Sequence, residues 1–308
     1  MADNYGYTMP ATPGGSNRGY GTPGQGHPGQ GQGQGYGAQG YPPQGQGYGY
    51  QSQGWGNATQ GYQQQGYASQ GQGYRLTYGV DIVFCIDCTE SMDNVIDIVK
   101  SRALSFYTDV QAVMAQKNKQ IDSLRVRVVA FRDYLAYEEE RRRHTHTNEP
   151  MLVTDFFTLP AEAHKLEASV KSLHPAGGGD DPEDGLEALA YSIRSDWALT
   201  SFRNRHIIVL WTDQEPHQLG FGAASSRYPR GMASSLAKLT EWWGDAMMPG
   251  YMPEQSAKRL ILFAPNAGAW SYISSNWDNV LHLPSRAGDH LQDIDYQKIL
   301  GSIAQTIA

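Results

Sequence analysis

The most informative segment of the chain reads Gly79-Val80-Asp81-Ile82-Val83-Phe84-Cys85-Ile86-Asp87, apolar almost throughout and closed by an acid. A continuous apolar run of this length is typical of a strand that is buried on both faces of a parallel sheet. We therefore predict a buried strand here, with Asp87 at its carboxyl end.

Similar apolar runs recur along the chain, and segments with helical spacing separate them. Further strands are predicted at 125–131, 206–212, 259–264 and 279–283, with an edge strand at 151–159. Helices are predicted from 91 to about 116 and at about 160–173, 182–197, 231–245 and 290–307, with a short helix after 264. Strands that alternate with helices in this way indicate an α/β fold with a doubly wound, mostly parallel sheet.

Residues 1–74 differ sharply in composition from the rest of the chain. They contain 22 Gly, 15 Gln and 10 Tyr, no Leu, Ile, Val or Phe, and two charged residues, Asp3 and Arg18. Without aliphatic surface to bury, such a segment cannot offset the roughly 1–2 kcal/mol per residue that ordering of the backbone costs. We predict a disordered low-complexity tail at 1–74, rich in Gly, Gln, Tyr and Pro, and one folded domain at 75–308. The tail is a flexible tether, a segment for weak multivalent self-association through its tyrosines, or a specific docking motif.

Charge and cysteine content exclude several classes of protein. The tail carries one acid and one base, so the formal net charge of −7 lies entirely on 75–308. An acidic domain does not attract phosphate backbones through its bulk charge, so nucleic acid is not expected as a partner. We see no secretory signal and no window apolar enough to span a membrane, so we expect a cytoplasmic protein without a membrane partner. Cys85 and Cys88 give no disulfide framework.

Three acidic segments follow predicted strands or open a predicted helix. They lie at 87–91, at 177–184, which begins with a glycine turn, and at 212–215. In doubly wound folds, ligands bind outside the carboxyl ends of the strands. Carboxylates and hydroxyls from three loops, with no basic residue among them, suit a hard divalent cation. The alternative for any single acid at a strand end is that it caps a helix.

The first acidic segment has the D-x-T-x-S spacing. Alternate residues of an extended turn point the same way, so Asp87, Thr89 and Ser91 can face one point. The helix that follows contributes amide donors that orient the carboxylate. The spacing therefore predicts that these three side chains share one ion.

These segments resemble the metal-ion-dependent adhesion site of the von Willebrand factor A (vWA) family. That family's pattern is D-x-S/T-x-S, then a Gly-rich loop, then a T-D pair after a buried strand. The resemblance covers about 78–305 and is closest to intracellular members, such as those associated with alpha-type kinases and those in bacterial stress-response operons. Their loops D-C-T-x-S-M, F/Y-R-D, G-G-G-D-x-P-E-D and D-x-x-P-H are matched by 87–92, 131–133, 177–184 and 213–217.

The resemblance implies a sheet topology and a set of ligands. The six strands would have the order 3-2-1-4-5-6, with strand three antiparallel at the edge. The resemblance implies that Mg²⁺ or Mn²⁺ is held by Asp87, Thr89, Ser91, Asp180 and Asp213. Adhesive members have a Thr where this chain has Asp180, or Asp181 if the turn slips by one residue. The extra carboxylate would neutralise the ion and favour a flatter interface.

Other residues near these loops have two interpretations each. Asp133, Asp181 and His217 could orient the ligands, but Asp133 suits a capping role equally well and His217 suits hydrogen bonding within its loop. The run Glu-Glu-Glu-Arg-Arg-Arg at 138–143 is expected to be a solvated charged loop, with a partner-docking patch as the alternative. Cys85 is expected to pack because it lies within the buried strand. The C-x-x-C spacing of Cys85 and Cys88 does not indicate zinc, because the chain has no second cysteine pair.

The candidate site has metal ligands but no catalytic partners. No Ser-His-Asp or Cys-His set, P-loop or dinucleotide fingerprint is visible. We therefore expect a protein that is not an enzyme but a metal-dependent protein interaction module, an intracellular scaffold or regulator. By the resemblance, its partners would include kinases, phosphatases or ATPases.

Two alternatives stay open. One is an assembly protein that forms condensates or filaments through its tyrosine-rich tail. The other is a magnesium-dependent phosphohydrolase, since an acidic site with a divalent ion can activate water. The haloacid-dehalogenase pattern has an Asp two positions after the first, where this chain has Thr89, which counts against the hydrolase.

Overall fold

The computed structural model describes residues 76–143, 148–176, 182–199, 201, 203–285 and 296–307, so the predicted tail at 1–74 lies outside the described residues. Its strands are β1 (Leu76–Asp87), β2 (Lys119–Phe131), β3 (Met151–Val153), β4 (Phe157–Leu159), β5 (Asn204–Trp211), β6 (Lys258–Pro265) and β7 (Val280–Ser285). Its helices are α1 (Asp93–Arg102), α2 (Phe106–Gln116), α3 (Tyr134–Arg142), α4 (Ala163–Lys171), α5 (Gly185–Ile193), α6 (Leu236–Trp243), α7 (Gly268–Asn276) and α8 (Tyr296–Ile307), with short 3₁₀ helices η1 (Glu90–Met92) and η2 (Phe221–Ala224). Within these ranges, every helix falls short of the length and apolarity that crossing a bilayer requires.

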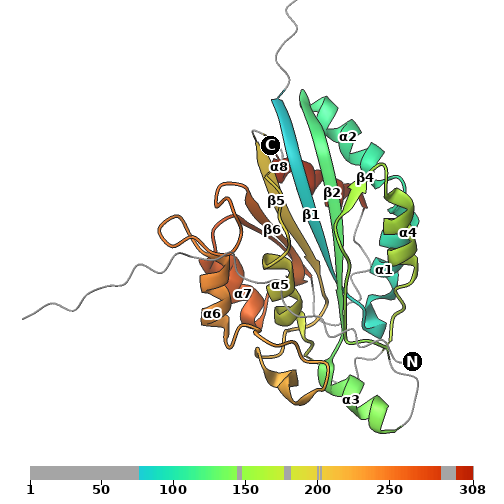
Figure 1. Ribbon diagram of the computed structural model, residues 1–308, viewed down its shortest axis with the longest axis vertical. Helices are drawn as coiled ribbons and strands as arrows, with labels where there is room; N and C mark the ends of the chain where they lie inside the picture. The colour runs from blue at the N-terminus through green and yellow to red at the C-terminus, as the bar shows by residue number, and fades with distance from the viewer. Residues whose placement is uncertain are drawn as a thin grey trace, which may run out of the picture. The chain divides into compact units, whose positions relative to one another are not determined.

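The described strands form one sheet with the order β3-β2-β1-β5-β6-β7, and β4 also pairs with β2. The pairs β2–β1, β1–β5, β5–β6 and β6–β7 are parallel, whereas β3 and β4 run antiparallel to β2. With β3 and β4 counted as one edge segment, this is the predicted order. The α/β class and the mostly parallel sheet are confirmed (Figure 1).

The edge segment is two short strands, β3 and β4, rather than the one strand predicted. On β2, the paired residues Val126 and Val129 are three positions apart. Their partners, Phe157 and Val153, are four positions apart. The edge therefore carries one extra residue, as in a β-bulge. Thr154 occupies the gap, where its Oγ1 accepts a hydrogen bond from a β2 backbone N–H at 3.0 Å.

Helices bury both faces of the sheet, which explains the unbroken apolar runs. Along β1, Ile82 and Phe84 belong to one hydrophobic cluster, which also contains side chains of α1, α2, α4 and α8. Val83 and Cys85 belong to a second cluster, with side chains of α5, α6 and α7. Figure 1 shows α1, α2 and α4 on one side of the sheet and α5, α6 and α7 on the other. Because successive side chains of a strand alternate between faces, each face needs its own apolar set.

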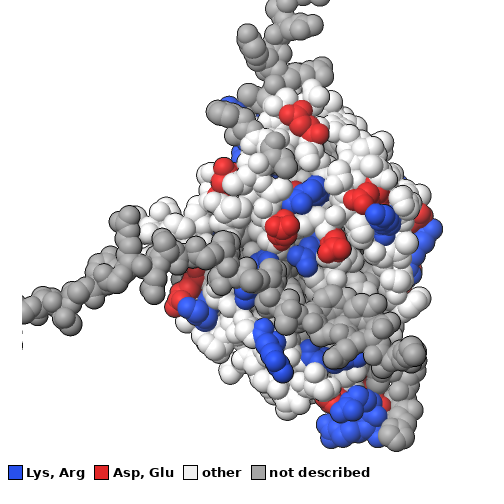
Figure 2. Space-filling model, viewed as in Figure 1, with Lys and Arg blue, Asp and Glu red and all other residues white. Residues whose placement is uncertain are grey.

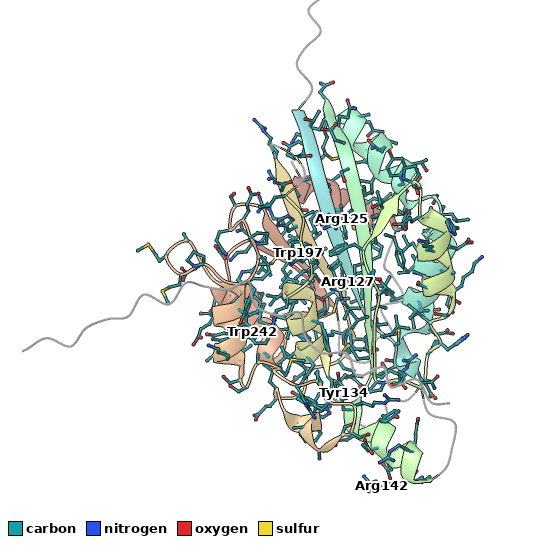
Figure 3. All side chains as sticks on the ribbon, viewed as in Figure 1. Arg125, Arg127, Tyr134, Arg142, Trp197 and Trp242 are labelled. Carbon is teal, nitrogen blue, oxygen red and sulfur yellow. The ribbon has the colours of Figure 1, made fainter. Side chains whose placement is uncertain are left out.

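The acid inside this buried strand, Asp81, is neutralised by an arginine on β2. Arg125 Nε and Nη2 donate to the two carboxylate oxygens of Asp81 at 2.8 and 2.6 Å. The guanidinium also lies over the Phe156 ring, 4.4 Å from its centroid. Figure 3 shows Arg125 midway along the sheet and Tyr134 near the end at which α3 lies. The ion pair belongs to the fold rather than to the carboxyl edge of the strands.

The long helix predicted from 91 to about 116 is interrupted. α1 ends at Arg102 and α2 begins at Phe106. Ser105 lies in the break, with its Oγ 3.3 Å from Arg102 O and 2.9 Å from Asp109 Oδ2. A serine hydroxyl that bonds to local groups competes with the helical hydrogen bonds, which accounts for the interruption.

Candidate metal centre

The carboxyl end of β1 holds the first group of predicted ligands. Asp87 is the last residue of β1 and is fully buried. Its Oδ1 accepts hydrogen bonds from Thr89 N at 2.9 Å and Thr89 Oγ1 at 2.7 Å. Its Oδ2 accepts a hydrogen bond from Thr212 Oγ1 at 2.7 Å. The D-x-T spacing therefore folds the chain back onto the carboxylate, as side chains of aspartate do in turns.

Ser91 and Asp213 extend this network to the loop after β5. Ser91 Oγ donates to Asp213 Oδ1 at 2.9 Å and lies 3.4 Å from Thr89 Oγ1. Asp213 and Thr89 are buried and Ser91 is half-buried. Four of the five predicted ligands, Asp87, Thr89, Ser91 and Asp213, thus lie together at the carboxyl edge of the sheet, and Thr212 holds the first of them in place.

The surroundings of Asp87 fit a cation. Burial raises the pKa of Asp87 to about 6, with a smaller contribution from Asp213, although hydrogen bonds from Thr89 and Thr212 oppose the shift. A bound cation would favour the charged form of both carboxylates. Two carboxylates and two hydroxyls form an all-oxygen donor set, which suits Mg²⁺ or Mn²⁺.

Asp180 and Asp181, the acids of the predicted second loop, lie outside the described residues. The residues on either side of them are held beside the other two loops. Before them, the backbone N–H of Ala176 donates to the carbonyl of Cys88 at 3.0 Å. After them, Glu183 forms two backbone hydrogen bonds with the loop after β5, at 3.1 and 2.7 Å. The chain therefore enters and leaves this segment at the candidate centre.

Asp133 and His217 contact each other at the same edge of the sheet. Asp133 Oδ1 caps α3 by accepting a hydrogen bond from Ala136 N at 2.7 Å, and Oδ2 lies 3.0 Å from His217 Nε2. Burial opposes the shift, but hydrogen bonds from His217 and Ala136 lower the pKa of Asp133 below its usual value. The His217 ring stacks on Phe221 with 3.9 Å between centroids. Asp133 therefore combines a capping role with a contact to His217.

Sequence reasoning gave no role to Asp184, which the structure brings to this pair. Asp184 immediately precedes α5, and its Oδ2 accepts a hydrogen bond from Tyr134 N at 2.7 Å. One ligand atom from each of Asp133, Asp184 and His217 lies within 4.8 Å of the others. Nothing in their spacing predicts this, because they are 51 and 33 positions apart along the chain.

Glu187 is a second residue that sequence reasoning missed. It lies one turn into α5 and has no measurable exposure. Its Oε1 accepts hydrogen bonds from Gly220 N at 3.0 Å and Tyr228 Oη at 2.9 Å. The signal in the sequence is a pair of acids three positions apart at a helix start, which a solvent-exposed helix would also show.

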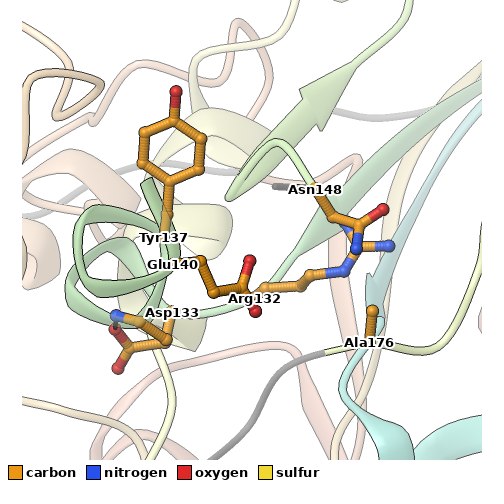
Figure 4. A pocket seen from close by; sticks show the side chains of 7 residues that line it. Arg132, Asp133, Tyr137, Glu140, Asn148 and Ala176 are labelled. Atoms are coloured by element: carbon orange, nitrogen blue, oxygen red, sulfur yellow. Dashed lines mark hydrogen bonds between the residues drawn. The ribbon is translucent and has the colours of Figure 1, made fainter. Parts of the chain in front are cut away.

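A small pocket adjoins Asp133 on the side of α3. It is lined by Arg132, Asp133, Ala136, Tyr137, Glu140, Asn148 and Ala176 (Figure 4). The Arg132 side chain extends from the α3 side towards Asn148 in this view. Its guanidinium donates to the carbonyl of Glu149 at 3.0 Å and to the carbonyl of His174. Arg132 thereby joins two segments that flank the candidate centre.

The run at 138–143, predicted as a solvated charged loop, belongs to helix α3 and to the residue that caps its C-terminus. Glu138 is 7% exposed, and its Oε1 accepts hydrogen bonds from Ser226 N and Ser226 Oγ, at 2.5 and 2.6 Å. Its Oε2 accepts from Arg141 Nε at 3.0 Å. The prediction of a loop was wrong, whereas 139–143 are exposed or half-buried as expected. The burial of Glu138 could not be predicted because its partner Ser226 lies 88 positions further along the chain. The arginines of α3 stay exposed, and Figure 2 shows basic side chains gathered at the end where Figure 1 places α3.

Replacing this buried glutamate by its uncharged isostere, Glu138→Gln, should destabilise the protein at pH 7. Despite burial, hydrogen bonds from Ser226 and Arg141 lower the pKa of Glu138 to about 2. A depressed pKa contributes stability above about pH 4.3, the unfolded value, and this is lost as the pH falls towards the folded value. We expect a loss of about 1.5–3 kcal/mol at pH 7 that shrinks by more than half at about pH 2.5, measured by urea unfolding. Equal losses at both pH values would contradict the assignment, and Glu139→Gln, an exposed neighbour, is the control.

Comparisons with known proteins give likeness to solved structures alone. No family model and no curated protein matches the chain. The pilus adhesin SpaC from Lactobacillus rhamnosus GG, in an open conformation, is 15% identical over 75% of this chain and 30% of its own, with a TM-score of 0.40. The PilB minor pilin from Streptococcus sanguinis is 14% identical over 75% of this chain and 62% of its own, with a TM-score of 0.40. The vWF domain of the type V pili tip protein Mfa5 from Porphyromonas gingivalis is 18% identical over 46% of this chain and 39% of its own, with a TM-score of 0.29. The chain thus spans less than two thirds of each of these chains.

Proposed function

We propose that the carboxyl edge of the sheet binds Mg²⁺ or Mn²⁺ and uses the ion to bind a protein partner. The observation that carries this proposal is the buried network that joins Asp87, Thr89, Ser91 and Asp213. Side chains from two loops, 122 positions apart, converge there as oxygen donors. The resemblance of these loops to a metal-ion-dependent adhesion site supports the step from ion to partner.

The number of carboxylates sets the character of the proposed interface. An ion held by two carboxylates keeps little positive charge, and Asp180 would add a third from the second loop. Such an ion has little attraction left for a partner's acid, because its charge is already balanced. In this proposal the ion holds the three loops in shape, and the partner binds the loops. Strong magnesium-dependent binding of an isolated acidic peptide would contradict this part.

The class of partner follows from the resemblance and is part of the same proposal. Intracellular vWA proteins of the kind resembled suggest a kinase, phosphatase or ATPase as partner, and a scaffold or regulator inside the cell as the role. In this proposal the protein catalyses no reaction. A phosphoester hydrolysed at a measurable rate, with the rate lost in Asp87→Asn, would contradict it.

Affinity capture with the full-length protein tests the dependence on the ion. Four baits are compared: wild type with Mg²⁺, wild type with EDTA, Asp87→Asn with Mg²⁺, and the exposed α1 control Asp97→Asn with Mg²⁺. We expect a set of proteins retained by wild type and Asp97→Asn with Mg²⁺ and lost from the other two baits. The same proteins on all four baits would show that the ion plays no part in recognition.

A further inference from the structure

A second buried group of ligand atoms lies at the carboxyl edge of the sheet, apart from the Asp87 network. It consists of Asp133 at the start of α3, Asp184 at the start of α5 and His217 in the loop after β5. The three residues are 2%, 0% and 5% exposed. Three separate segments of chain therefore bring two carboxylates and an imidazole together out of solvent.

The distance between Asp133 and His217 in this group matches that between neighbouring ligands of one ion. Metal–ligand bonds to His nitrogen and carboxylate oxygen are about 2.0–2.2 Å, which places neighbouring ligand atoms about 3–3.5 Å apart. Asp133 Oδ2 and His217 Nε2 are 3.0 Å apart, and all three ligand atoms lie within 4.8 Å of one another. A dication can therefore reach all three with small adjustments of side chains.

Two buried polar atoms beside the group have no hydrogen-bond partner among the described residues. They are Glu187 Oε2 and Tyr134 Oη, on side chains that are 0% and 1% exposed. The Tyr134 ring packs against Tyr228, 5.1 Å between centroids, and Tyr228 Oη donates to the other oxygen of Glu187. These side chains therefore form one buried polar region, which adjoins the group because Tyr134 N donates to Asp184 Oδ2.

Of the carboxylates in this region, Asp133 contacts His217 and Glu187 accepts hydrogen bonds from Gly220 N and Tyr228 Oη. Among the described residues, neither Asp133 nor Glu187 forms an ion pair with a lysine or an arginine. Burial raises the pKa of Glu187, although hydrogen bonds and the nearby His217 oppose the shift. Buried carboxylates are normally paired with cations or bound to metal ions, because leaving their charge unpaired is costly. A dication would supply the missing charge.

We propose that Asp133, Asp184 and His217 bind one first-row transition-metal dication, with Zn²⁺ as the preferred ion, at a second site distinct from the Asp87 network. An imidazole ligand separates the two sites chemically, because it favours zinc and related ions, whereas the all-oxygen Asp87 network favours Mg²⁺. The ion ties the starts of α3 and α5 to the loop after β5. Glu187 places a further carboxylate beside the group.

Zinc binding in excess magnesium tests this proposal. The full-length protein is stripped of metal and then titrated with Zn²⁺ in a calorimeter. The buffer contains 10 mM Mg²⁺, so that magnesium fills the site at the Asp87 network. We expect one zinc equivalent for wild type and for Asp87→Asn, and an affinity at least 100-fold lower for His217→Gln. His174→Gln, a change at an exposed histidine, should bind like wild type. Absence of a zinc equivalent in wild type would overturn the proposal, as would its loss from Asp87→Asn with retention in His217→Gln.

Two further measurements keep the test decisive if His217→Gln does not fold. Glu187→Gln leaves the three ligands in place and removes a nearby negative charge that attracts the ion, so we expect zinc affinity to fall about tenfold. Wild type loaded with Mn²⁺ in excess Mg²⁺ should show coupling of the electron spin to an imidazole nitrogen. No nitrogen coupling would overturn the proposal, since it would place no histidine on the ion.

Discussion

Asp87→Asn should have opposite effects on the metal-free and the metal-loaded protein. We expect the affinity for Mn²⁺ or Mg²⁺ to fall at least 100-fold, because Asp87 lies at the centre of the network and receives hydrogen bonds from Thr89 and Thr212. At pH 7.5 without metal, the same variant should be more stable than wild type, by about 1–3 kcal/mol. With saturating Mg²⁺ the order should reverse, since the ion stabilises only the protein that binds it.

The sign of the metal-free effect follows from the pKa. Burial raises the folded pKa of Asp87 to about 6, above the ordinary value of an aspartate. The folded state then holds its proton more tightly than the unfolded state, so stability falls as the pH rises from about 4 to about 6 and stays low above that. An asparagine at this position does not ionise, so the variant does not lose stability over this pH range.

Urea unfolding with EDTA and with Mg²⁺, together with calorimetric titration of Mn²⁺, measures both effects. Asp97→Asn on the exposed face of α1 should change neither quantity. If Asp87→Asn were destabilising in EDTA and left metal affinity unchanged, Asp87 would be a structural cap rather than a ligand.

Of all the substitutions proposed for this protein, Trp270→Ala should cause the largest loss of stability. Trp270 on α7 is fully buried, and its Nε1 donates to Gln214 O at 3.0 Å. Its ring also covers Gly185 at the start of α5, where an added Cβ would lie 2.9 Å from the ring. Removing a buried tryptophan leaves a cavity that costs about 3–5 kcal/mol.

Trp270→Phe separates the two roles of this side chain. It keeps most of the ring volume and removes the hydrogen bond to Gln214, so we expect a loss of about 1–2 kcal/mol. Because Gln214 follows Asp213, the affinity for Mg²⁺ should also fall in Trp270→Ala. Urea unfolding and metal titration measure the two effects. A loss below about 1 kcal/mol for Trp270→Ala would contradict the packing described.

Much of the fold could be predicted because the strands of a doubly wound sheet are apolar on both faces. The apolar segments of β1, β5 and β6 predicted buried strands without any knowledge of what they pack against. Helix α3 was missed because its sequence is dominated by charge, and two tyrosines, Tyr134 and Tyr137, provide its buried aromatic face. The acid that anchors it, Glu138, is buried by serines far along the chain. Spacing along the sequence cannot show such a contact.

The candidate centre likewise has a part that could be predicted from the sequence and a part that could not. The D-x-T-x-S spacing is local, so the convergence of Asp87, Thr89 and Ser91 could be predicted from the sequence. Thr212 and Asp213 lie beside Asp87, as predicted, because the loops that carry them follow β1 and β5, which are neighbouring parallel strands. The group formed by Asp133, Asp184 and His217 depends on how α3 and α5 begin relative to the sheet. That relation is tertiary, and it was not predicted.

Metal binding at the carboxyl edge is tested by a crystal structure of the protein grown with Mn²⁺ in place of Mg²⁺. Anomalous scattering locates manganese independently of the protein. We expect a peak among Asp87, Thr89, Ser91 and Asp213, within bonding distance of the hydroxyl of Ser91. A well-ordered carboxyl edge without a manganese peak between these four side chains would contradict it.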